Sequence, residues 1–391
     1  MSPLPWSQQL VDGLANRKSA GRLRELRFRT GAQGARIVIG DKKLLSFCSN
    51  DYLGLANHAA IRKAFIDAVE HQGVGSGAAH LLTGHSVYHQ QLEEALASFT
   101  GQQKVLLFSS GYQANMGLID ALMSRDDVIL QDKLNHASLL DGGRLSAARQ
   151  YRYQHNNVNA LAQRLQQTKR VERRLIVSDG VFSMDGDLAP LPDLVHLAAE
   201  HRAGVIIDDA HGFGVLGQRG AGSVEHWQIK SEQSPIIVGT FGKAFGTAGA
   251  FVAADNVVIE TLIQQARTYI YTTAQPAAIA AATMQSLKLV ESESWRREKL
   301  QALITQFRRG ARALTLNVAD SITAIQPVII GDDSLALQIG QQLEQAGILV
   351  GVIRPPTVPA GSARLRITLS ADHSESDVAR LLDALERILC T

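Results

Sequence analysis

The 391-residue sequence is poor in cysteine and has no long apolar run. Its two cysteines, Cys48 and Cys390, cannot build a disulfide framework and do not have the spacing of zinc ligands. The longest weakly polar stretch, around residues 276–284, is far shorter than the roughly 20 residues that span a bilayer. The N-terminus shows no apolar segment after a basic start. We therefore expect a soluble cytoplasmic protein with no membrane partner.

The sequence also lacks an excess of charge of either sign. Its 39 Lys and Arg residues stand against 37 Asp and Glu residues, so the formal net charge is only +2. A protein without a strong basic field gives no sign of a nucleic-acid partner. With 45% hydrophobic and 19% charged residues, the chain has ample apolar material for a large core and is not disordered.

Short apolar runs recur between residues 104 and 255, and most are followed by a longer amphipathic stretch. Continuous aliphatic runs suit strands that are covered on both faces, which favours a mainly parallel sheet between layers of helices. We predict an α/β fold with a large doubly wound domain and ligands at the carboxyl ends of its strands. The expected strands are 104–108, 128–130, 175–177, 205–207, 236–238 and 249–253.

The pattern changes after about residue 290, where helices and strands alternate in a smaller set. A helix at 295–314, a strand at 324–330 and a helix at 334–346 are followed by two strands and a last helix. Ser374 and Asp377 have the spacing of a capping box at the start of that last helix. We expect three parts: an N-terminal helix and short strand at 1–48, a large domain at 49–290, and a small α+β domain at 291–391.

Lys243 is the first candidate for chemistry. It lies in Gly239-Thr-Phe-Gly-Lys-Ala-Phe-Gly246, directly after an apolar strand and between glycines. Most lysines are solvated surface residues, but few are enclosed by glycines at a strand end. A Walker loop is excluded, because Gly239 and Gly242 are three residues apart and Ala244 takes the place of the required Ser or Thr. The motif favours a lysine that forms an imine with an aldehyde.

Asp208 follows a buried strand, and His211 comes three residues later. A buried carboxylate needs a charged or hydrogen-bonding partner, because burying it unpaired costs several kcal/mol. That partner would be a protonated ring nitrogen if the cofactor is a pyridoxal. A helix N-cap or a metal site are the alternatives, and no third metal ligand with suitable spacing lies nearby, so we expect no metal.

Two further strand ends carry polar residues. The turn from Ser109 to Gly111 leads from a strand into a helix, whose free amides suit a phosphate, although ordinary serine capping explains the turn equally well. His136, in Asn-His-Ala-Ser, offers an imidazole that could stack on a flat ring. Taken alone, that histidine is better explained as an ordinary packed or capping residue.

Taken together, the motifs identify a resemblance to the α-oxoamine synthases, which have the type I (aspartate aminotransferase-like) fold of pyridoxal-phosphate enzymes. The match is collinear and covers nearly the whole chain. The motifs that carry it are SNDYLGL (49–55), VGSGAAHLLTG (74–84), SSGYQAN (109–115), NHAS (135–138), DGVFSMDGD (179–187), DDAHGFGVLG (208–217), TFGKAFG (240–246) and RPPTVPAGSARLR (354–366).

The resemblance implies pyridoxal 5'-phosphate as the cofactor and gives each matching residue a role. The catalytic residues it implies are Lys243, which binds the cofactor, Asp208 at the pyridine nitrogen, His136 stacked on the ring, and His211. Further cofactor contacts fall to His211 and Ser183 at the phenolic oxygen, to Gly111, Tyr112 and Thr240 at the phosphate, and to Thr272 or Thr273 at the phosphate of a neighbouring subunit. The implied substrate contacts are Arg24, Asn50, His136, Arg354, Thr357 and Arg366.

The family condenses a small amino acid with an acyl thioester and releases CO2 and thiol. The wording of residues 354–366 favours L-alanine and a pimeloyl thioester, carried by coenzyme A or acyl carrier protein, in a homodimer with shared active sites. Glycine with acetyl-CoA, as in 2-amino-3-ketobutyrate ligase, or 5-aminolevulinate synthesis are the alternatives within the family. An aminotransferase, an aldolase or a non-enzymatic binding protein are the alternatives outside it.

Residue 80 departs from the family wording. Many relatives have GSGGSR where this chain has GSGAAH, so His80 stands in place of an arginine. Any contact of that arginine is then absent or made by His80. The Arg-rich segment from Arg17 to Arg29 has a plainer interpretation, a solvated helix face, except at Arg24, where the resemblance implies a contact with the acyl substrate.

Overall fold

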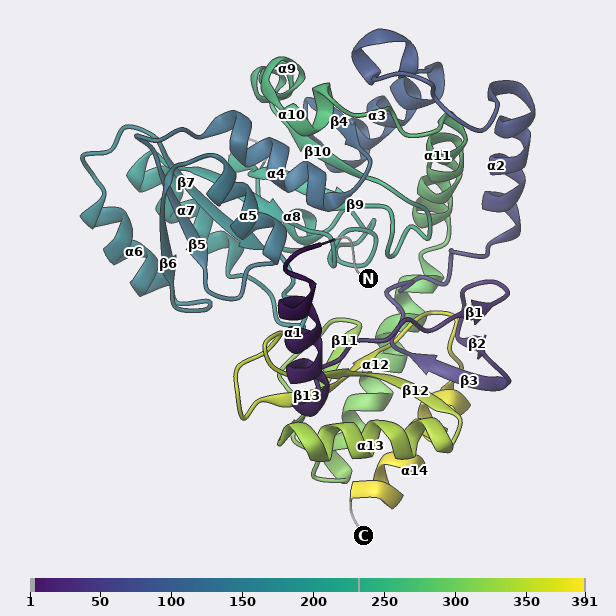
Figure 1. Cartoon of the computed structure of the whole chain (residues 1–391). Helices are drawn as coiled ribbons and strands as arrows, with labels where there is room; N and C mark the ends of the chain where they lie inside the picture. The colour runs from purple at the N-terminus through teal and green to yellow at the C-terminus, as the bar shows by residue number, and fades with distance from the viewer. Residues whose placement is uncertain (1–3, 231–232, 390–391) are drawn as a thin grey trace.

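The computed structural model describes residues 4–230 and 233–389. Two sheets organise these residues, and Figure 1 shows the larger sheet above and the smaller one below. Among the described helices, none is long and apolar enough to cross a membrane. Cys48 has a free thiol, and Cys390 lies outside the described residues.

The larger sheet has seven strands in the order β4-β10-β9-β8-β7-β5-β6. Strands β9, β8, β7, β5 and β6 pair in parallel, whereas β10 is antiparallel to both β4 and β9. The strands are β4 (Lys104–Phe108), β5 (Val128–Asp132), β6 (Arg149–Tyr153), β7 (Arg174–Asp179), β8 (Gly204–Asp208), β9 (Ile236–Thr240) and β10 (Ala250–Ala254).

Alternate residues of these strands enter two different hydrophobic clusters, one on each face of the sheet. Val105 and Leu107 join the larger cluster, whereas Leu106 and Phe108 join the other. The helices that accompany the sheet are α2 (Ala59–Gln72), the π-helix η1 (His80–Gly84), α3 (Val87–Thr100), α4 (Gly111–Leu122), α5 (Ala137–Leu145), α6 (Val158–Gln167), α7 (Leu191–His201), α8 (Ser223–His226), α9 (Asn256–Gln265), α10 (Arg267–Ile270) and α11 (Ala277–Ser292). The predicted doubly wound, mainly parallel sheet is confirmed, because helices cover both faces.

Strand β6 was missed by the sequence analysis. Its sequence, Arg-Gln-Tyr-Arg-Tyr, contains no continuous apolar run, and only Tyr153 of the five residues is buried. The strand lies at the edge of the sheet and pairs only with β5. Because most of this strand is exposed to solvent, it lacks the run of aliphatic residues that marks the other six strands.

The smaller sheet joins the two ends of the chain. Its order is β1-β2-β3-β12-β13-β11, and β3 pairs in parallel with β12, with Leu45 opposite Ile348. The N-terminal strands thus lie in the same sheet as the C-terminal ones, although the proposed division at residues 48 and 290 stays a prediction. The elements are β1 (Arg29–Thr30), β2 (Arg36–Ile39), β3 (Lys42–Phe47), β11 (Ile325–Gly331), β12 (Ile348–Ile353), β13 (Ala363–Thr368), α12 (Trp295–Ala313), α13 (Asp333–Gln345) and α14 (Glu375–Leu389).

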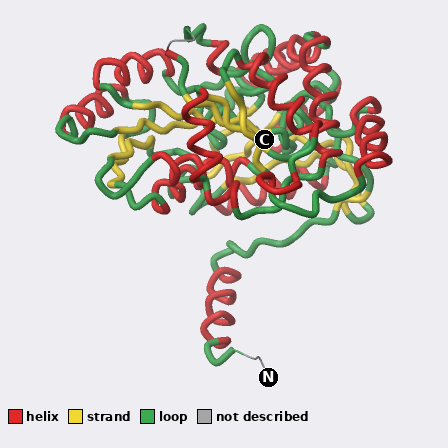
Figure 2. Tube along the Cα trace, turned by 90° about the horizontal axis from the view of Figure 1, so that it is seen from above, coloured by secondary structure: helices red, strands yellow, loops and turns green. Residues whose placement is uncertain are grey.

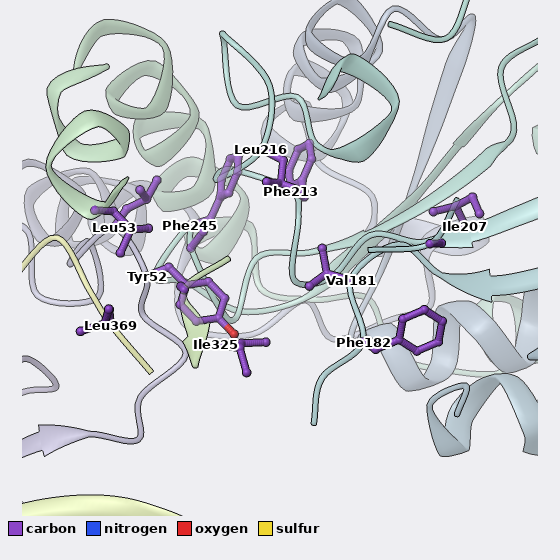
Figure 3. Close-up of a cluster of buried hydrophobic side chains, with 14 of the residues drawn as sticks. Tyr52, Leu53, Val181, Phe182, Ile207, Phe213, Leu216, Phe245, Ile325 and Leu369 are labelled. Atoms are coloured by element: carbon purple, nitrogen blue, oxygen red, sulfur yellow. The ribbon is translucent and has the colours of Figure 1, made fainter. Parts of the chain in front are cut away.

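One hydrophobic cluster connects the two sheets. It includes Ile207 of β8, Tyr52 and Phe245 near the centre, and Ile325 and Leu369 of the smaller sheet region (Figure 3). The predicted capping box before α14 is also present, because Ser374 N donates to Asp377 Oδ2 (2.9 Å) and Asp377 N donates to Ser374 Oγ (3.2 Å). Continuous packing of this kind positions the loops of both sheets against one another.

The first helix, α1 (Ser7–Ser19), stands apart from this core. It has no buried residue, and Figure 2 shows it projecting away from the rest of the molecule. Leu26 and Phe28, in the segment that follows, are 86% and 78% exposed. Large apolar side chains exposed in this way usually mark a surface that another molecule covers.

Gly246 fixes the end of the Lys243 loop against residues 55–56, and its replacement is expected to destabilise the fold. Its φ is +65°, and an added Cβ would lie 2.4 Å from the backbone N of Ala56. We predict that Gly246→Ala lowers the free energy of unfolding by more than about 3 kcal/mol in urea titrations. Gly101→Ala is the matched control, because φ there is +70° with no atom within 4 Å of the added Cβ. Gly101→Ala should lower the free energy of unfolding by only about 1 kcal/mol. Equal decreases for the two variants would contradict the steric argument.

Candidate active site

The carboxyl ends of the parallel strands bring the predicted polar residues to one edge of the larger sheet. Asp208 is the last residue of β8, and Lys243 lies three residues beyond the end of β9. His136 follows β5, and Ser183 follows β7. Because β5, β7, β8 and β9 pair in parallel, these four positions lie on the same side of the sheet.

A chain of hydrogen bonds runs from Lys243 to the smaller sheet. The Nζ atom of Lys243 lies 3.0 Å from Nε2 of His211, and Nδ1 of His211 lies 2.7 Å from the hydroxyl of Tyr52. The Tyr52 hydroxyl donates to Asn50 Oδ1 (3.2 Å), which also accepts from both terminal nitrogens of Arg366 (3.3 and 3.2 Å). The lysine and the arginine are thus connected through three intervening side chains.

Burial sets the protonation of this chain. Burial lowers the pKa of Lys243 to about 8, although the nearby carboxylates of Asp208 and Asp179 act in the opposite direction. Burial also lowers the pKa of His211 well below its ordinary value, and the Lys243 charge adds to that effect. A substantial fraction of Lys243 is therefore neutral near pH 8, and His211 is a neutral imidazole. A neutral amine is the form that attacks a carbonyl.

Asp208 is held by two donors at the sheet edge. Asn115 Nδ2 donates to Asp208 Oδ2 (2.6 Å), and the backbone N of Ala210 donates to Asp208 Oδ1 (3.0 Å). Asn115, which is fully buried, also donates to Ser138 Oγ (2.9 Å). The carboxylate is 6% exposed and keeps lone pairs that these donors do not use, so it can accept a further proton donor.

His136 lies over the same region. Its backbone N donates to Asp179 Oδ2 (2.7 Å), which fixes the loop after β5 to the end of β7. Its ring Nδ1 lies 2.7 Å from Ser138 Oγ, so the ring is held at one edge. Burial lowers the pKa of His136, and the Lys243 charge contributes to the lowering. A neutral imidazole held in this way can stack on a flat ring without adding charge.

The start of α4 offers backbone donors. Ser110 caps the helix by accepting from Gln113 N (3.3 Å), and the space beside Gly111 is open, with no atom within 4 Å of an added Cβ. The N-terminal amides and the positive helix end suit a phosphate there. Thr240, the other predicted phosphate contact, donates its hydroxyl to Gly249 O (3.0 Å), and Tyr112 donates its hydroxyl to Asp141. Because its hydroxyl is engaged, Tyr112 could bind a phosphate through its backbone amide but not through its side chain.

This donor set fits pyridoxal phosphate. A partly neutral lysine can condense with its aldehyde, the spare lone pairs of Asp208 can accept its ring N–H, and the α4 amides can hold its phosphate. In the described part of the chain, no group of three or more His, Cys, Asp or Glu side chains is arranged to hold a metal ion. The roles themselves stay predictions.

Some predicted residues lie apart from this centre. Arg354 donates to Gly21 O (2.9 Å) on the N-terminal segment, and among the described residues it forms no hydrogen bond with Lys243 or Arg366. Arg24 is exposed on the same segment, and Thr272 lies after α10 beside the isolated bridge of Thr273 with Ala79. Thr357 lines a cavity together with His136 and Ser183. Within a single chain, then, Arg366 and Asn50 join the lysine network, whereas Arg354, Arg24, Thr272 and Thr357 do not.

Three residues of the site were missed by sequence reasoning: Tyr52, Asn115 and Asp179. All three lie inside motifs that carried the resemblance, but nothing in the local pattern distinguished them from packing residues. Asp179 is 4% exposed, and burial with the neighbouring Asp208 carboxylate raises its pKa well above the ordinary value. A carboxylate at the end of a second buried strand was the available signal, since it needs a partner as much as Asp208 does.

Comparisons with known proteins agree with this geometry. Residues 42–385 match the family model described as aminotransferase class I and II. An 8-amino-7-oxononanoate synthase of Nitrosococcus oceani is 58% identical over 96% of this chain and 100% of its own length, and one of Pseudomonas putida is 55% identical over 96% of each chain. A solved serine palmitoyltransferase of S. paucimobilis with bound PLP has a TM-score of 0.92 at 28% identity and covers 98% of each chain.

The lowered pKa of Lys243 gives a prediction for chemical modification of the protein without cofactor. The rate at which an amine-reactive reagent acylates Lys243 should rise with pH, with a midpoint of about 8, because only the neutral amine reacts. Peptide mass spectrometry follows the modified fraction of Lys243 across pH 6–11. Exposed Lys169 is the reference in the same digest. Parallel profiles for the two lysines would contradict the assignment of a buried, perturbed amine.

Proposed function

The chain belongs to the class I and II aminotransferase family, in which its relatives are 8-amino-7-oxononanoate synthases, and from this premise we propose that it joins L-alanine to a pimeloyl thioester. It acts as a pyridoxal-phosphate-dependent acyltransferase with the type I fold that the sequence motifs predicted. The products are 8-amino-7-oxononanoate, CO2 and free thiol, which assigns the reaction to biotin biosynthesis.

The observation that carries the chemistry is the placement of Lys243 beside His211, with the buried carboxylate of Asp208 close enough to affect its pKa. When bound, pyridoxal phosphate supplies an aldehyde that condenses with amines and a protonated ring that accepts the electron pair released at the substrate Cα. Asp208 would keep the ring nitrogen protonated, since a charge-assisted hydrogen bond favours that form. His136 would stack on the ring and hold it in the site.

Proton transfer falls to Lys243. In the chain without ligands the pKa of this amine is about 8, so with the cofactor and alanine bound Lys243 would be the group placed to take up the alanine α-proton. Because the Tyr52 hydroxyl donates to Asn50, the neutral His211 donates from Nδ1 to Tyr52 and accepts at Nε2 from the lysine, without adding a second charge. The α-carbon then bonds to the thioester carbonyl carbon, the C–S bond breaks, and the thiolate takes up a proton as it leaves. Loss of the carboxylate as CO2 precedes the final protonation at the same carbon.

Arg366 is the proposed partner of the alanine carboxylate. Its guanidinium is 7% exposed and is oriented by Asn50 Oδ1 and by Ser183 O, to which Nε donates at 2.5 Å. No acidic side chain pairs with it among the described residues, so its charge is available to an anion. A rigid fork of donors matches the geometry of a carboxylate. Arg354 remains a second candidate that would need to leave its contact with Gly21 O.

We also propose that two copies of the chain share their active sites in the cytoplasm. The exposed apolar residues of the N-terminal segment, and Leu82 and Tyr271 at 78% and 73% exposure near Thr272, support a partner surface. A second chain that covers these regions would place its Arg24 and Thr272 in the active site of the first chain. Coenzyme A or acyl carrier protein would deliver the acyl group.

An assay of the purified holoenzyme tests the function. With L-alanine and pimeloyl-CoA, we expect equimolar free thiol and CO2, and with glycine and acetyl-CoA little of either. Asp208→Asn is the informative variant: exchange of the alanine α-proton with solvent should slow by about 100-fold or more, because an amide cannot hold the ring nitrogen protonated. Thiol release without CO2, or a preference for glycine, would contradict the proposed reaction. Unchanged exchange would mean that another acid serves the ring.

The role of Arg24 gives a prediction for kinetics. Arg24→Ala should raise the KM for pimeloyl-CoA about tenfold, since it removes one charge-assisted contact, and should leave alanine binding unchanged. Steady-state kinetics with each substrate varied in turn measure both values, and sedimentation checks that the dimer persists. Arg17→Ala, on the exposed helix α1, is the control. Weaker alanine binding, or no effect on either substrate, would mean that Arg24 is a solvated surface residue and does not contact the acyl substrate.

A further inference from the structure

A cavity beside His136 lies between loops of the two sheets. Its volume is about 830 Å³, and it is lined by the loop after β5, Arg152 of β6, the loop after β7 and the segment from Pro356 to Arg364. His136, Ser183 and Thr357, which the proposed function uses, are all on its wall. A volume of this size accommodates a small organic ligand.

Much of the cavity wall is apolar. Leu134, Leu140, Phe182, Met184 and Val358 contribute to the lining, together with two prolines of the segment 356–359. Methylene groups gain free energy when such a wall removes them from water. The wall therefore suits an unbranched hydrocarbon chain that begins near His136.

Some charged residues at the cavity wall are paired with opposite charges and others are not. Arg364 is 6% exposed and pairs with Asp185 at 2.5 Å, so these two charges neutralise each other. Asp132 and Asp187, behind the wall, are both bonded to His155 (3.0 and 2.8 Å). The pKa of His155 is raised to about 10, because the two carboxylate bonds outweigh the effect of burial. His155 is therefore a cation at neutral pH that neutralises these acids.

Lys133 and Arg152 remain as cations on the wall without an acidic partner. Neither forms an ion pair in the described part of the chain, and Arg152 Nη2 donates only to the backbone O of Lys133. Lys133 precedes His136 by three residues, so their Cα atoms are at most about 11 Å apart. A seven-carbon chain is roughly 7 Å long, the reach of two extended residues. An anion at the far end of such a chain could therefore meet these cations.

We propose that this cavity receives the acyl chain of the thioester, and that Lys133 and Arg152 bind the carboxylate at the end of that chain. The inference rests on the proposed function and adds the residues that distinguish a dicarboxylic acyl group from a simple fatty acyl group. Apolar walls hold the methylene groups, and the two unpaired cations select the terminal charge.

Two thioesters of equal length test the proposal in the holoenzyme with saturating L-alanine. Pimeloyl-CoA and heptanoyl-CoA both have seven acyl carbons, but only the first has a terminal carboxylate. Lys133→Gln and Arg152→Gln should each raise the KM for pimeloyl-CoA about tenfold and change the heptanoyl-CoA constants less than twofold. Arg149→Gln is the matched control, because Arg149 lies on the same strand β6 but does not line the cavity. It should leave both substrates unchanged.

The other outcomes overturn the proposal. Equal increases in KM for both thioesters would mean that Lys133 and Arg152 bind the phosphates of the coenzyme A carrier. An unchanged KM for both would mean that they bind neither those phosphates nor the acyl carboxylate. A second measurement is independent of turnover: pimelate, but not heptanoate, should shield Lys133 from an amine reagent, as read by peptide mass spectrometry. Absence of shielding refutes the carboxylate site. Shielding in a wild-type protein that fails to condense alanine with pimeloyl-CoA would instead refute the proposed function and keep the site.

Discussion

Two buried carboxylates on neighbouring strands impose the arrangement of the site. Asp208 and Asp179 lie opposite each other in the parallel pair of β8 and β7, and they are 6% and 4% exposed. Burying two like charges side by side costs several kcal/mol unless donors surround them. Asn115, Ala210 N and His136 N supply such donors, and Lys243 supplies positive charge. The protonated ring of a bound cofactor would add another positive donor. Cofactor binding would therefore reduce the free-energy cost of burying these two carboxylates.

The smaller sheet completes the site from the other side. Arg366 of β13 donates to Ser183 O and to Asn50 Oδ1, and thereby links the loop after β7 with the segment after β3. Arg364, two residues earlier on the same strand, pairs with Asp185 of that loop. Because β13 is paired with a strand on each side, β12 and β11, both arginines hold fixed positions. The cavity for the proposed acyl chain thus has walls that belong to both sheets.

Burial tunes the groups that transfer protons. The same low-polarity surroundings lower the pKa of Lys243 and of His211, so an amine and an imidazole 3.0 Å apart need not repel each other as two cations. Tyr52, 1% exposed, fixes the other side of the imidazole. His155 shows the opposite result, because two carboxylates face it and raise its pKa to about 10. Partners, and not burial alone, decide which histidine carries charge.

The sequence by itself determined the elements whose cause is local. Aliphatic runs predicted six of the seven strands of the larger sheet, because a strand covered on both faces must be apolar throughout. The glycines around Lys243 and the acid at the end of β8, Asp208, marked two residues of the candidate active site. Residue spacing could not reveal Tyr52 against His211, Asn115 against Asp208, or the pairing of β3 with β12, which joins residues about 300 positions apart in the chain. Such contacts depend on how distant segments pack. Only the tertiary structure therefore decided which of several plausible polar residues meet Lys243, and which cations of the cavity wall stay unpaired.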